Sequence, residues 1–285
     1  MIVVTGATGQ LGRLVVEGLL ERLPAGEIVA AVRSPEKANW AAERGVVVRK
    51  ADYDQPETLS SAFEGADKVL LVSGSDVGKR VAQHKAAVEA ARDAGVAHLV
   101  YTSAPKADTS PLVLAPDHKA TEEFIRASGL TYTILRNNWY SEGYTQAIEQ
   151  GARTGNFVGS AGDGRVATAT RADYAAAAVE VLTGDGHANE IYELSGDIAW
   201  TRAELAAEIS KATGKEVTYT DLPTDEHKAV LVQAGLPAPV AELLAAIDAN
   251  IKDGVLSATP GDLKALIGRP PTPIADTVAE VVKGL

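Results

Sequence analysis

The sequence predicts an α/β protein with a doubly wound parallel sheet and a smaller C-terminal α/β lobe for the substrate. Two observations carry this prediction. Strand-like apolar runs alternate with helix-like segments over the first half of the chain, and the runs are nearly continuous stretches of Val, Leu and Ala. Such strands are typical of a parallel sheet that is covered by helices on both faces. A third observation, three glycines after the first strand, indicates the kind of sheet.

The first twenty residues combine a strand, a tight turn and a helix. Residues 1–5 are mainly apolar, Gly6, Gly9 and Gly12 follow at three-residue spacing, and apolar side chains then recur with helical period. Glycines in such a turn let backbone N–H groups approach a pyrophosphate, and the helix presents its positive end to the same anion. The spacing is one residue away from the G-x-G-x-x-G fingerprint, and its place at the start of the chain favours a Rossmann sheet over a turn without a ligand.

The following segments continue the alternation of strands and helices. Strands are predicted over 27–33, 46–52, 68–73, 96–103 and 130–136, and helices over 56–63, 77–94 and 116–128. Ser34 and Pro35 have the pattern of an N-cap and a first helical turn. Strands and helices that alternate at this spacing indicate right-handed parallel crossovers.

The regular alternation of strands and helices ends after residue 136. A glycine-rich stretch over 151–164 is followed by predicted helices over 172–182 and 201–213, the second opening with a Thr-Arg-Ala-Glu capping box, and by strands over 190–194 and 215–221. Most of the chain beyond residue 225 has a helical pattern broken at prolines. We therefore predict an NADP-binding domain over 1–136 and a substrate lobe over 137–285, interleaved with the sheet and mostly helical toward the C-terminus.

The composition excludes several kinds of function. The chain has no cysteine, which excludes disulfides and thiol catalysis, and its formal net charge of −11 argues against a nucleic-acid surface. The five histidines show no metal-ligand spacing, so no metal is expected. The N-terminus lacks a basic lead and a long apolar run, so we expect no membrane span and a cytoplasmic protein. The oligomeric state stays open, and a homo-oligomer is one possibility.

The end of the second strand indicates which dinucleotide binds. In Rossmann proteins a carboxylate about 20 residues past the glycines binds the adenosine 2′-hydroxyl, whereas an arginine there accepts a 2′-phosphate. Here the strand ends in Arg33 with no acid at the tip, which favours NADP(H), with Lys37 as a second candidate charge. Asp52 follows the third strand and Ser73-Gly74-Ser75 closes the fourth, so we expect both to border the nucleotide crevice.

Five segments spread over nearly the whole chain carry a family resemblance: Thr5–Gly12, Val32–Lys37, His118–Glu122, Leu135–Glu142 and Ala169–Tyr174. Together they resemble the NmrA-like atypical short-chain dehydrogenases, in particular the NADPH-dependent quinone oxidoreductase type found in bacteria. The resemblance implies a small quinone stacked on the nicotinamide. It also implies a cofactor site, which together with the turn glycines comprises Gly6, Thr8, Gly9, Gln10, Leu11, Arg33, Ser73, Gly74, Ser75, Asn137, Asn138, Trp139, Tyr140, Ser141, Glu142 and Arg171.

The Tyr-x-x-x-Lys pair of the broader dehydrogenase family is missing, since Ala115 stands four residues before Lys119. Reduction of a ketone gives an alkoxide, for which a positioned proton donor is worth on the order of 10²–10⁴ in rate. Hydride addition to a quinone gives a resonance-stabilised anion that water can protonate, so holding the two rings in contact supplies most of the acceleration. The missing tyrosine argues against alcohol dehydrogenase chemistry and is compatible with quinone reduction.

Two residues are the candidates for catalysis. Lys119 is either a solvated lysine or a residue that holds the nicotinamide ribose or polarises a quinone oxygen, and the neighbouring His118 has the pattern of an exposed residue at a helix start. Tyr140, beside Trp139 in a loop after a strand, belongs either to a lid that stacks on a flat substrate or to packing between the lobes, and we favour the lid.

The leading hypothesis is an NADPH-dependent reductase that transfers hydride to a quinone. The alternative is a catalytically silent, NADP(H)-sensing NmrA-like regulator that binds a protein partner, because the missing tyrosine fits both. A third possibility keeps the reduction and changes the substrate to an imine, enone or sugar nucleotide.

Overall fold

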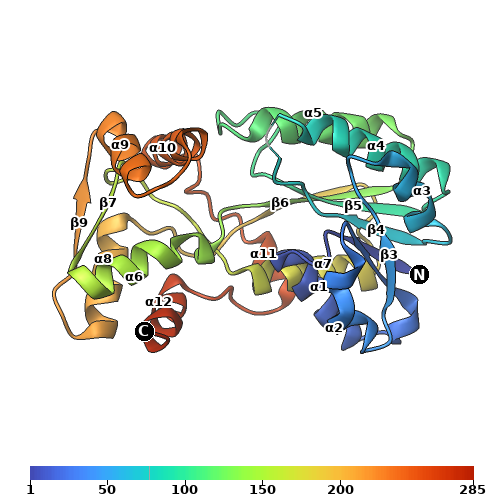
Figure 1. Cartoon of the computed structure of the whole chain (residues 1–285), viewed down its shortest axis with the longest axis horizontal. Helices are drawn as coiled ribbons and strands as arrows, with labels where there is room; N and C mark the ends of the chain where they lie inside the picture. The colour runs from blue at the N-terminus through green and yellow to red at the C-terminus, as the bar shows by residue number, and fades with distance from the viewer. Residues whose placement is uncertain (77) are drawn as a thin grey trace.

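The computed structural model describes residues 1–76 and 78–285, and its chain forms two lobes (Figure 1). The larger lobe holds a seven-stranded sheet in which every neighbouring pair is parallel. Its strands, in spatial order, are β3 (Val47–Lys50), β2 (Ile28–Val32), β1 (Ile2–Thr5), β4 (Lys68–Leu71), β5 (His98–Ser103), β6 (Tyr132–Asn137) and β8 (Glu190–Leu194). The predicted doubly wound Rossmann sheet is thus confirmed.

Helices cover both faces of this sheet. One face carries α1 (Gln10–Leu20), α2 (Asn39–Ala42), α7 (Arg171–Thr183) and α11 (Asp262–Ile267), and the other carries α3 (Pro56–Phe63), α4 (Arg80–Asp93) and α5 (Ala115–Ala127) (Figure 1). Because side chains alternate along a strand, Val4 packs toward α1 and Val3 toward α3. Both valines are fully buried, which explains why β1 is uniformly apolar.

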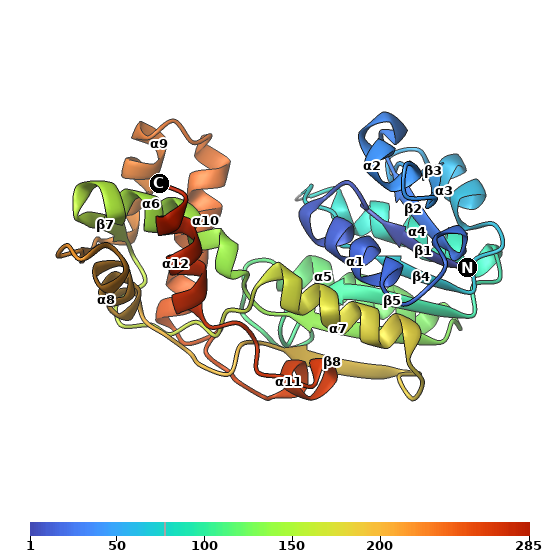
Figure 2. The same cartoon turned by 90° about the horizontal axis from the view of Figure 1, so that it is seen from below.

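The smaller lobe is built from separate pieces of the second half of the chain (Figure 2). It contains α6 (Thr145–Thr154), β7 (Asn156–Gly159), α8 (Arg202–Thr213), β9 (Thr218–Asp221), α9 (Thr224–Gln233), α10 (Ala238–Lys252) and α12 (Ile274–Lys283). The predicted capping box begins α8, where Thr201 Oγ1 accepts the Glu204 N–H at 3.1 Å. Three short 3-10 turns are η1 (Ala25–Glu27), η2 (Pro35–Ala38) and η3 (Ser141–Tyr144).

The two halves of the sequence exchange elements. Three elements of the predicted substrate lobe belong to the first lobe: β8 is the edge strand of its sheet, and α7 and α11 pack on the sheet, with α7 lying along α1. Alanines on α7, including Ala177 and Ala178, let the two helices approach closely. We keep 1–136 and 137–285 as a proposed division of the sequence, with these elements interleaved.

Several local expectations differ from the structure. Ser34 and Pro35 begin a 3-10 turn rather than an α-helix, and the Ser34 side chain makes no cap hydrogen bond, although its carbonyl accepts the Lys37 N–H at 3.0 Å. The helix expected over 77–94 is α4, whose first residue is Arg80, and Val77 lies outside the described residues. The glycine-rich stretch contains β7, which pairs with β9. No helix in the described ranges combines the length and apolar character needed to cross a bilayer.

Candidate active site

A cleft of about 820 Å³ opens at the carboxyl ends of the parallel strands. It lies where the strand order reverses between β1 and β4, the place at which doubly wound sheets bind their ligands. The cleft extends from the glycine turn to the loop after β6. Fifteen of the predicted site residues line it: Gly6, Thr8, Gly9, Gln10, Leu11, Arg33, Asp52, Ser73, Gly74, Ser75, Asn137, Asn138, Trp139, Tyr140 and Arg171.

The glycine turn directs the start of α1 at the cleft. Gly6 has a φ of +58°, and the Gly9 N–H donates to the Gly6 carbonyl at 2.8 Å. A Cβ on Gly12 would lie 2.4 Å from that same carbonyl oxygen, so only glycine fits there. No side chain caps α1, which leaves the N–H groups of Gln10 and Leu11 for an anion in the cleft. The turn therefore fits a nucleotide diphosphate.

The neighbouring strand ends are fixed by side-chain hydrogen bonds. The Tyr53 hydroxyl lies within hydrogen-bond distance of Thr5 Oγ1, at 2.6 Å, and of the Val72 carbonyl, at 2.9 Å, and burial raises the pKa of Tyr53. The Asp52 carboxylate makes a local hydrogen bond, since Oδ1 accepts the Asp54 N–H at 3.1 Å. Tyr53 and Asp52 thus form a rigid border of the cleft below the end of β3.

Arg33 lies exposed at the end of β2 and lines the same cleft. In the described part of the chain no carboxylate lies within ion-pair distance of its guanidinium. A guanidinium of this kind can bind a phosphate through a charge-assisted, bidentate contact.

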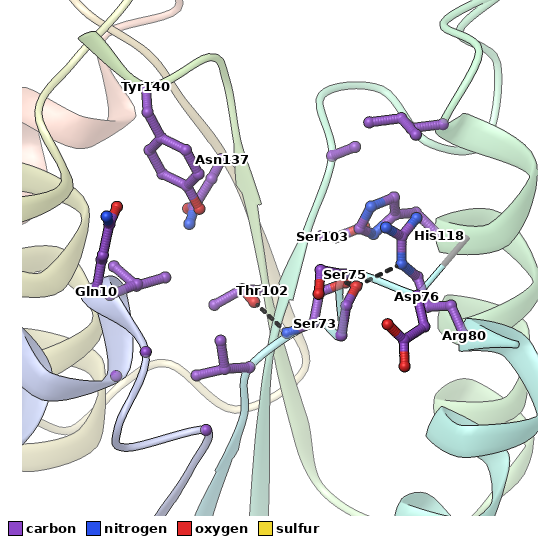
Figure 3. A pocket seen from close by; sticks show the side chains of 18 of the residues that line it. Gln10, Ser73, Ser75, Asp76, Arg80, Thr102, Ser103, His118, Asn137 and Tyr140 are labelled. Carbon is purple, nitrogen blue, oxygen red and sulfur yellow. Dashed lines mark hydrogen bonds between the residues drawn. The ribbon is translucent and has the colours of Figure 1, made fainter. Parts of the chain in front are cut away.

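The loop after β4 is held by three contacts from two elements, β5 and α4. The Ser73 N–H donates to Thr102 Oγ1 at 2.9 Å, and Arg80 Nε donates to the Gly74 carbonyl at 2.7 Å (Figure 3). The Gly74 N–H donates to His84 Nε2 at 3.0 Å. These bonds fix the middle of the cleft, where Ser73 and Ser75 face the open space (Figure 3).

The loop after β6 forms the far wall. Asn137 is 7% exposed, and its Oδ1 has no hydrogen-bond partner in the described structure. The ring of Tyr140 is sandwiched between the Arg171 guanidinium, 4.6 Å from the ring centroid, and the edge-on ring of Tyr174 at 5.3 Å. Burial raises the pKa of Tyr140, so the hydroxyl keeps its proton. Asn138 ties this loop to the rest of the chain, since Nδ2 donates to the Leu256 carbonyl at 3.1 Å.

Three predicted site residues do not reach the cleft. Lys119 is exposed and does not line it, because α5 turns the adjacent His118 inward instead. Ser141 is fully buried and bonds Thr168 Oγ1 at 2.9 Å. Glu142 accepts the Arg171 N–H at 2.8 Å and supports the loop from behind. The expectation that Lys119 takes part in the chemistry finds no support in this geometry.

Sequence reasoning gave too little weight to two side chains. His118 is 6% exposed and lines the cleft, as does Arg80. The signal for His118 was the helical phase, since Glu122 and Ile125 lie four and seven residues further on and are buried on the same face of α5. Arg80 carried no local signal, because its burial depends on Asp117 of another helix.

Ser103 at the end of β5 lines the cleft, but its hydroxyl hydrogen is used in a hydrogen bond within the protein. Its Oγ donates to Glu122 Oε1 at 2.7 Å, and Glu122 in turn forms a buried ion pair with Arg136 at 2.7 Å. A serine hydroxyl has one hydrogen, so Ser103 does not donate a second hydrogen bond into the cleft. The described residues contain no group of three His, Cys, Asp or Glu side chains arranged to hold a metal ion.

The sheet, the glycine turn and the cleft define a Rossmann-type dinucleotide-binding protein. The chain matches a family described as NAD(P)H-binding over residues 6–185. Quinone oxidoreductase 2 of Escherichia coli (strain K12) is 48% identical and aligns over 99% of this chain and 98% of its own. The crystal structure of the E. coli NADPH-dependent quinone oxidoreductase complexed with NADPH superposes with a TM-score of 0.96, over 99% of both chains.

Two further relatives fix the family more narrowly. The Citrobacter sp. triphenylmethane reductase complexed with NADP(H) has a TM-score of 0.96 at 44% identity, over 99% of this chain and 100% of that one. An NmrA-like family domain-containing oxidoreductase of Aspergillus flavus is 30% identical over 98% of this chain and 94% of its own. This chain belongs to the NAD(P)H-binding family, within its NmrA-like group.

Proposed function

We propose that the protein is an NADPH-dependent reductase that transfers hydride to a quinone and yields the hydroquinone in a two-electron step. The observation that carries this proposal is one continuous cleft with a phosphate-binding turn at one end and an apolar end beside Leu112, Leu114 and Trp139. The full-length similarity to quinone oxidoreductase 2 of E. coli supports the same activity.

The first lobe offers the contacts that NADPH needs. The N–H groups of Gln10 and Leu11 would bind the diphosphate, and Arg33 would bind the 2′-phosphate, while Asp52 would border the adenosine. The buried Asn137 Oδ1, which has no partner in the described structure, would accept an N–H from the bound nucleotide, and the carboxamide of nicotinamide carries such a donor. NADPH, when bound, supplies the hydride.

The far end of the cleft suits a flat apolar acceptor. Leu112 and Leu114 present aliphatic surface, and Trp139 with Tyr140 presents aromatic surface from the loop after β6. Aromatic walls favour planar ligands through offset stacking. We keep Trp139 and Tyr140 as residues that touch the bound rings, and we assign no catalytic part to Lys119.

The chemistry that the cleft lacks also favours a quinone. Ala115 is buried where the tyrosine of Tyr-x-x-x-Lys would stand, and Ser103 has already given its hydrogen to Glu122. A simple ketone would leave a localised alkoxide without the strong acid that its reduction needs. A quinone delocalises the same charge over its ring, so alignment of the rings provides much of the rate.

The test is NADPH oxidation by the purified protein with benzoquinone and naphthoquinone acceptors. We expect turnover with NADPH, and one hydroquinone formed per NADPH without release of semiquinone, which added cytochrome c would detect. Tight NADP(H) binding with no turnover across the quinone panel would contradict the proposal. That outcome would instead favour the cofactor-sensing regulator.

A further inference from the structure

A chain of hydrogen bonds runs from the loop after β4 to the cleft through three buried rings. His84 is fully buried, and its Nε2 accepts the Gly74 N–H at 3.0 Å. Its Nδ1 lies 3.0 Å from Thr121 Oγ1 and 3.4 Å from the hydroxyl of Tyr101. That hydroxyl lies 2.8 Å from Nδ1 of His118, the member of the chain that lines the cleft.

The backbone amide at the start of this chain fixes the tautomer of His84. An N–H can only donate, so His84 Nε2 is unprotonated, and the neutral ring carries its hydrogen on Nδ1. That hydrogen is donated to the closer Thr121 Oγ1, whose own hydrogen goes to the Asp117 carbonyl at 2.9 Å. His84 Nδ1 therefore has no lone pair for Tyr101, and the Tyr101 hydroxyl donates to His118 Nδ1 at 2.8 Å. His118 is then left with its hydrogen on Nε2.

The Nε2 atom of His118 faces the open cleft. It makes no hydrogen bond within the described part of the chain, and it is not among the fully enclosed polar atoms without a partner. Figure 3 shows the ring beside Ser103 and Arg80, across the cleft from Gln10 and Tyr140. His118 therefore presents a neutral N–H donor on the wall opposite the nucleotide turn.

The ring stays neutral. Burial, together with the nearby Arg80 guanidinium, lowers the pKa of His118 to about 3. Burial lowers the pKa of His84 to about 3 as well, with smaller contributions from His118 and Arg80. A neutral imidazole keeps its Nε2–H as a hydrogen-bond donor throughout the neutral pH range, where an ordinary histidine would begin to protonate below pH 6.5.

We propose that His118 is a catalytic hydrogen-bond donor to the oxygen of the acceptor substrate, held as the Nε2–H tautomer by Tyr101 and His84. This inference rests on the proposed quinone reduction. A hydride adds to the quinone and the developing negative charge on its oxygen is stabilised by the His118 N–H. Water then supplies the one proton that completes the hydroquinone, so His118 keeps its own hydrogen. Tyr101 and His84 are positioning residues.

Two substitutions of His118 separate donation from packing. His118→Leu removes the donor, and we expect kcat with a naphthoquinone to fall about 10- to 100-fold, less than loss of an oxyanion-hole donor costs because the charge is delocalised. His118→Gln returns an N–H close to the position of Nε2, so it should recover most of that loss. Neither variant should change the dissociation constant of NADPH, which also shows that the protein is folded.

Tyr101→Phe tests the tautomer. Without the hydroxyl, His118 is free to carry its hydrogen on Nδ1, so we expect a smaller fall in kcat at an unchanged KM. His187→Leu is the matched control, because His187 Nδ1 also bonds a tyrosine, Tyr192, at 2.8 Å, yet lies outside the cleft lining. Its kcat should equal that of the wild type.

Each outcome of these measurements either supports or overturns the donor role of His118. Wild-type kcat in His118→Leu, or equal losses in His118→Leu and His118→Gln, would overturn the donor role. A weaker NADPH affinity with unchanged kcat would assign His118 to the nucleotide instead, which also overturns it. A wild-type protein that is inert toward every quinone would contradict the proposed function itself, before any variant is compared.

Discussion

The two walls of the cleft are built in different ways. The diphosphate part of the nucleotide wall is one continuous stretch, in which Gly6 to Gly12 place backbone N–H groups at the start of α1. The opposite wall is assembled from side chains of α4, β5 and α5, with Arg80, Ser103 and His118 brought together only by the fold. The backbone site for the diphosphate is determined by a short local sequence, whereas the wall that holds His118 depends on contacts between elements far apart in the sequence.

The largest effect on nucleotide binding is expected from Gly12→Ala on the nucleotide wall. The new Cβ would lie 2.4 Å from the Gly6 carbonyl oxygen, which belongs to the backbone and cannot move without opening the turn. We expect at least a 100-fold weaker NADPH affinity in a fluorescence titration, equivalent to about 2.7 kcal/mol or more. Gly26→Ala is the control, since a Cβ there meets nothing within 4 Å. Normal NADPH binding by Gly12→Ala would show that the turn does not form the diphosphate site.

The second prediction concerns the support of the side-chain wall. Glu122→Ala removes the most buried of the three carboxylates that pair with Arg136, the others being those of Asp108 and Glu193. Loss of one member of a buried ion pair typically costs about 3–5 kcal/mol, which urea unfolding would measure. The control Glu89→Ala breaks the exposed pair with Lys85 and should cost less than about 1 kcal/mol. Equal stability of the two variants would mean that Arg136 is satisfied without Glu122.

The third prediction is an acid sensitivity of the same wall. The folded protein holds His84 and His118 neutral down to about pH 3, whereas the unfolded chain takes up protons near pH 6.5. The contribution of these two histidines to the free energy of unfolding is therefore fully present above pH 6.5. It is lost as the pH falls toward 3, at up to about 1.4 kcal/mol per pH unit for each histidine. His118→Gln should show a shallower loss than the wild type in urea unfolding between pH 6.5 and 4.5. Identical slopes would indicate that His118 is not held neutral.

The smallest effect is expected from Arg33→Ala. The residue is exposed, so its contact with a 2′-phosphate is partly screened by solvent. We expect the dissociation constant of NADPH to rise about 10-fold, or about 1.4 kcal/mol, while that of NADH changes little. Arg44→Ala, which removes the same charge outside the cleft, serves as the control. An equal loss for both nucleotides would contradict selection of the 2′-phosphate by Arg33.

These differences explain what could be predicted from the sequence. The parallel sheet and the glycine turn follow from local apolar runs and from Gly6, Gly9 and Gly12, and both were predicted. Helical phase determines which side chains of α5 face the protein interior, and therefore whether His118 or Lys119 reaches the cleft. In the structure Lys119 is exposed and His118 is buried, because His118 shares its helix face with the buried Glu122 and Ile125.

Other parts of the site had no local signal at all. The hydrogen bond between Tyr101 and His118 joins β5 to α5, and the bond from Gly74 to His84 closes a turn whose geometry no spacing rule gives. Likewise, β7 forms only because β9, about 60 residues later, pairs with it. Such contacts appear once the chain is folded.

The most direct test of the division between the two walls is a crystal structure of the protein with NADP⁺ bound. We expect the diphosphate within hydrogen-bond distance of the Gln10 and Leu11 N–H groups, the 2′-phosphate at Arg33, and an open space between the nicotinamide and His118 Nε2. A diphosphate bound away from the start of α1, or a nicotinamide that leaves no space before His118, would contradict the account.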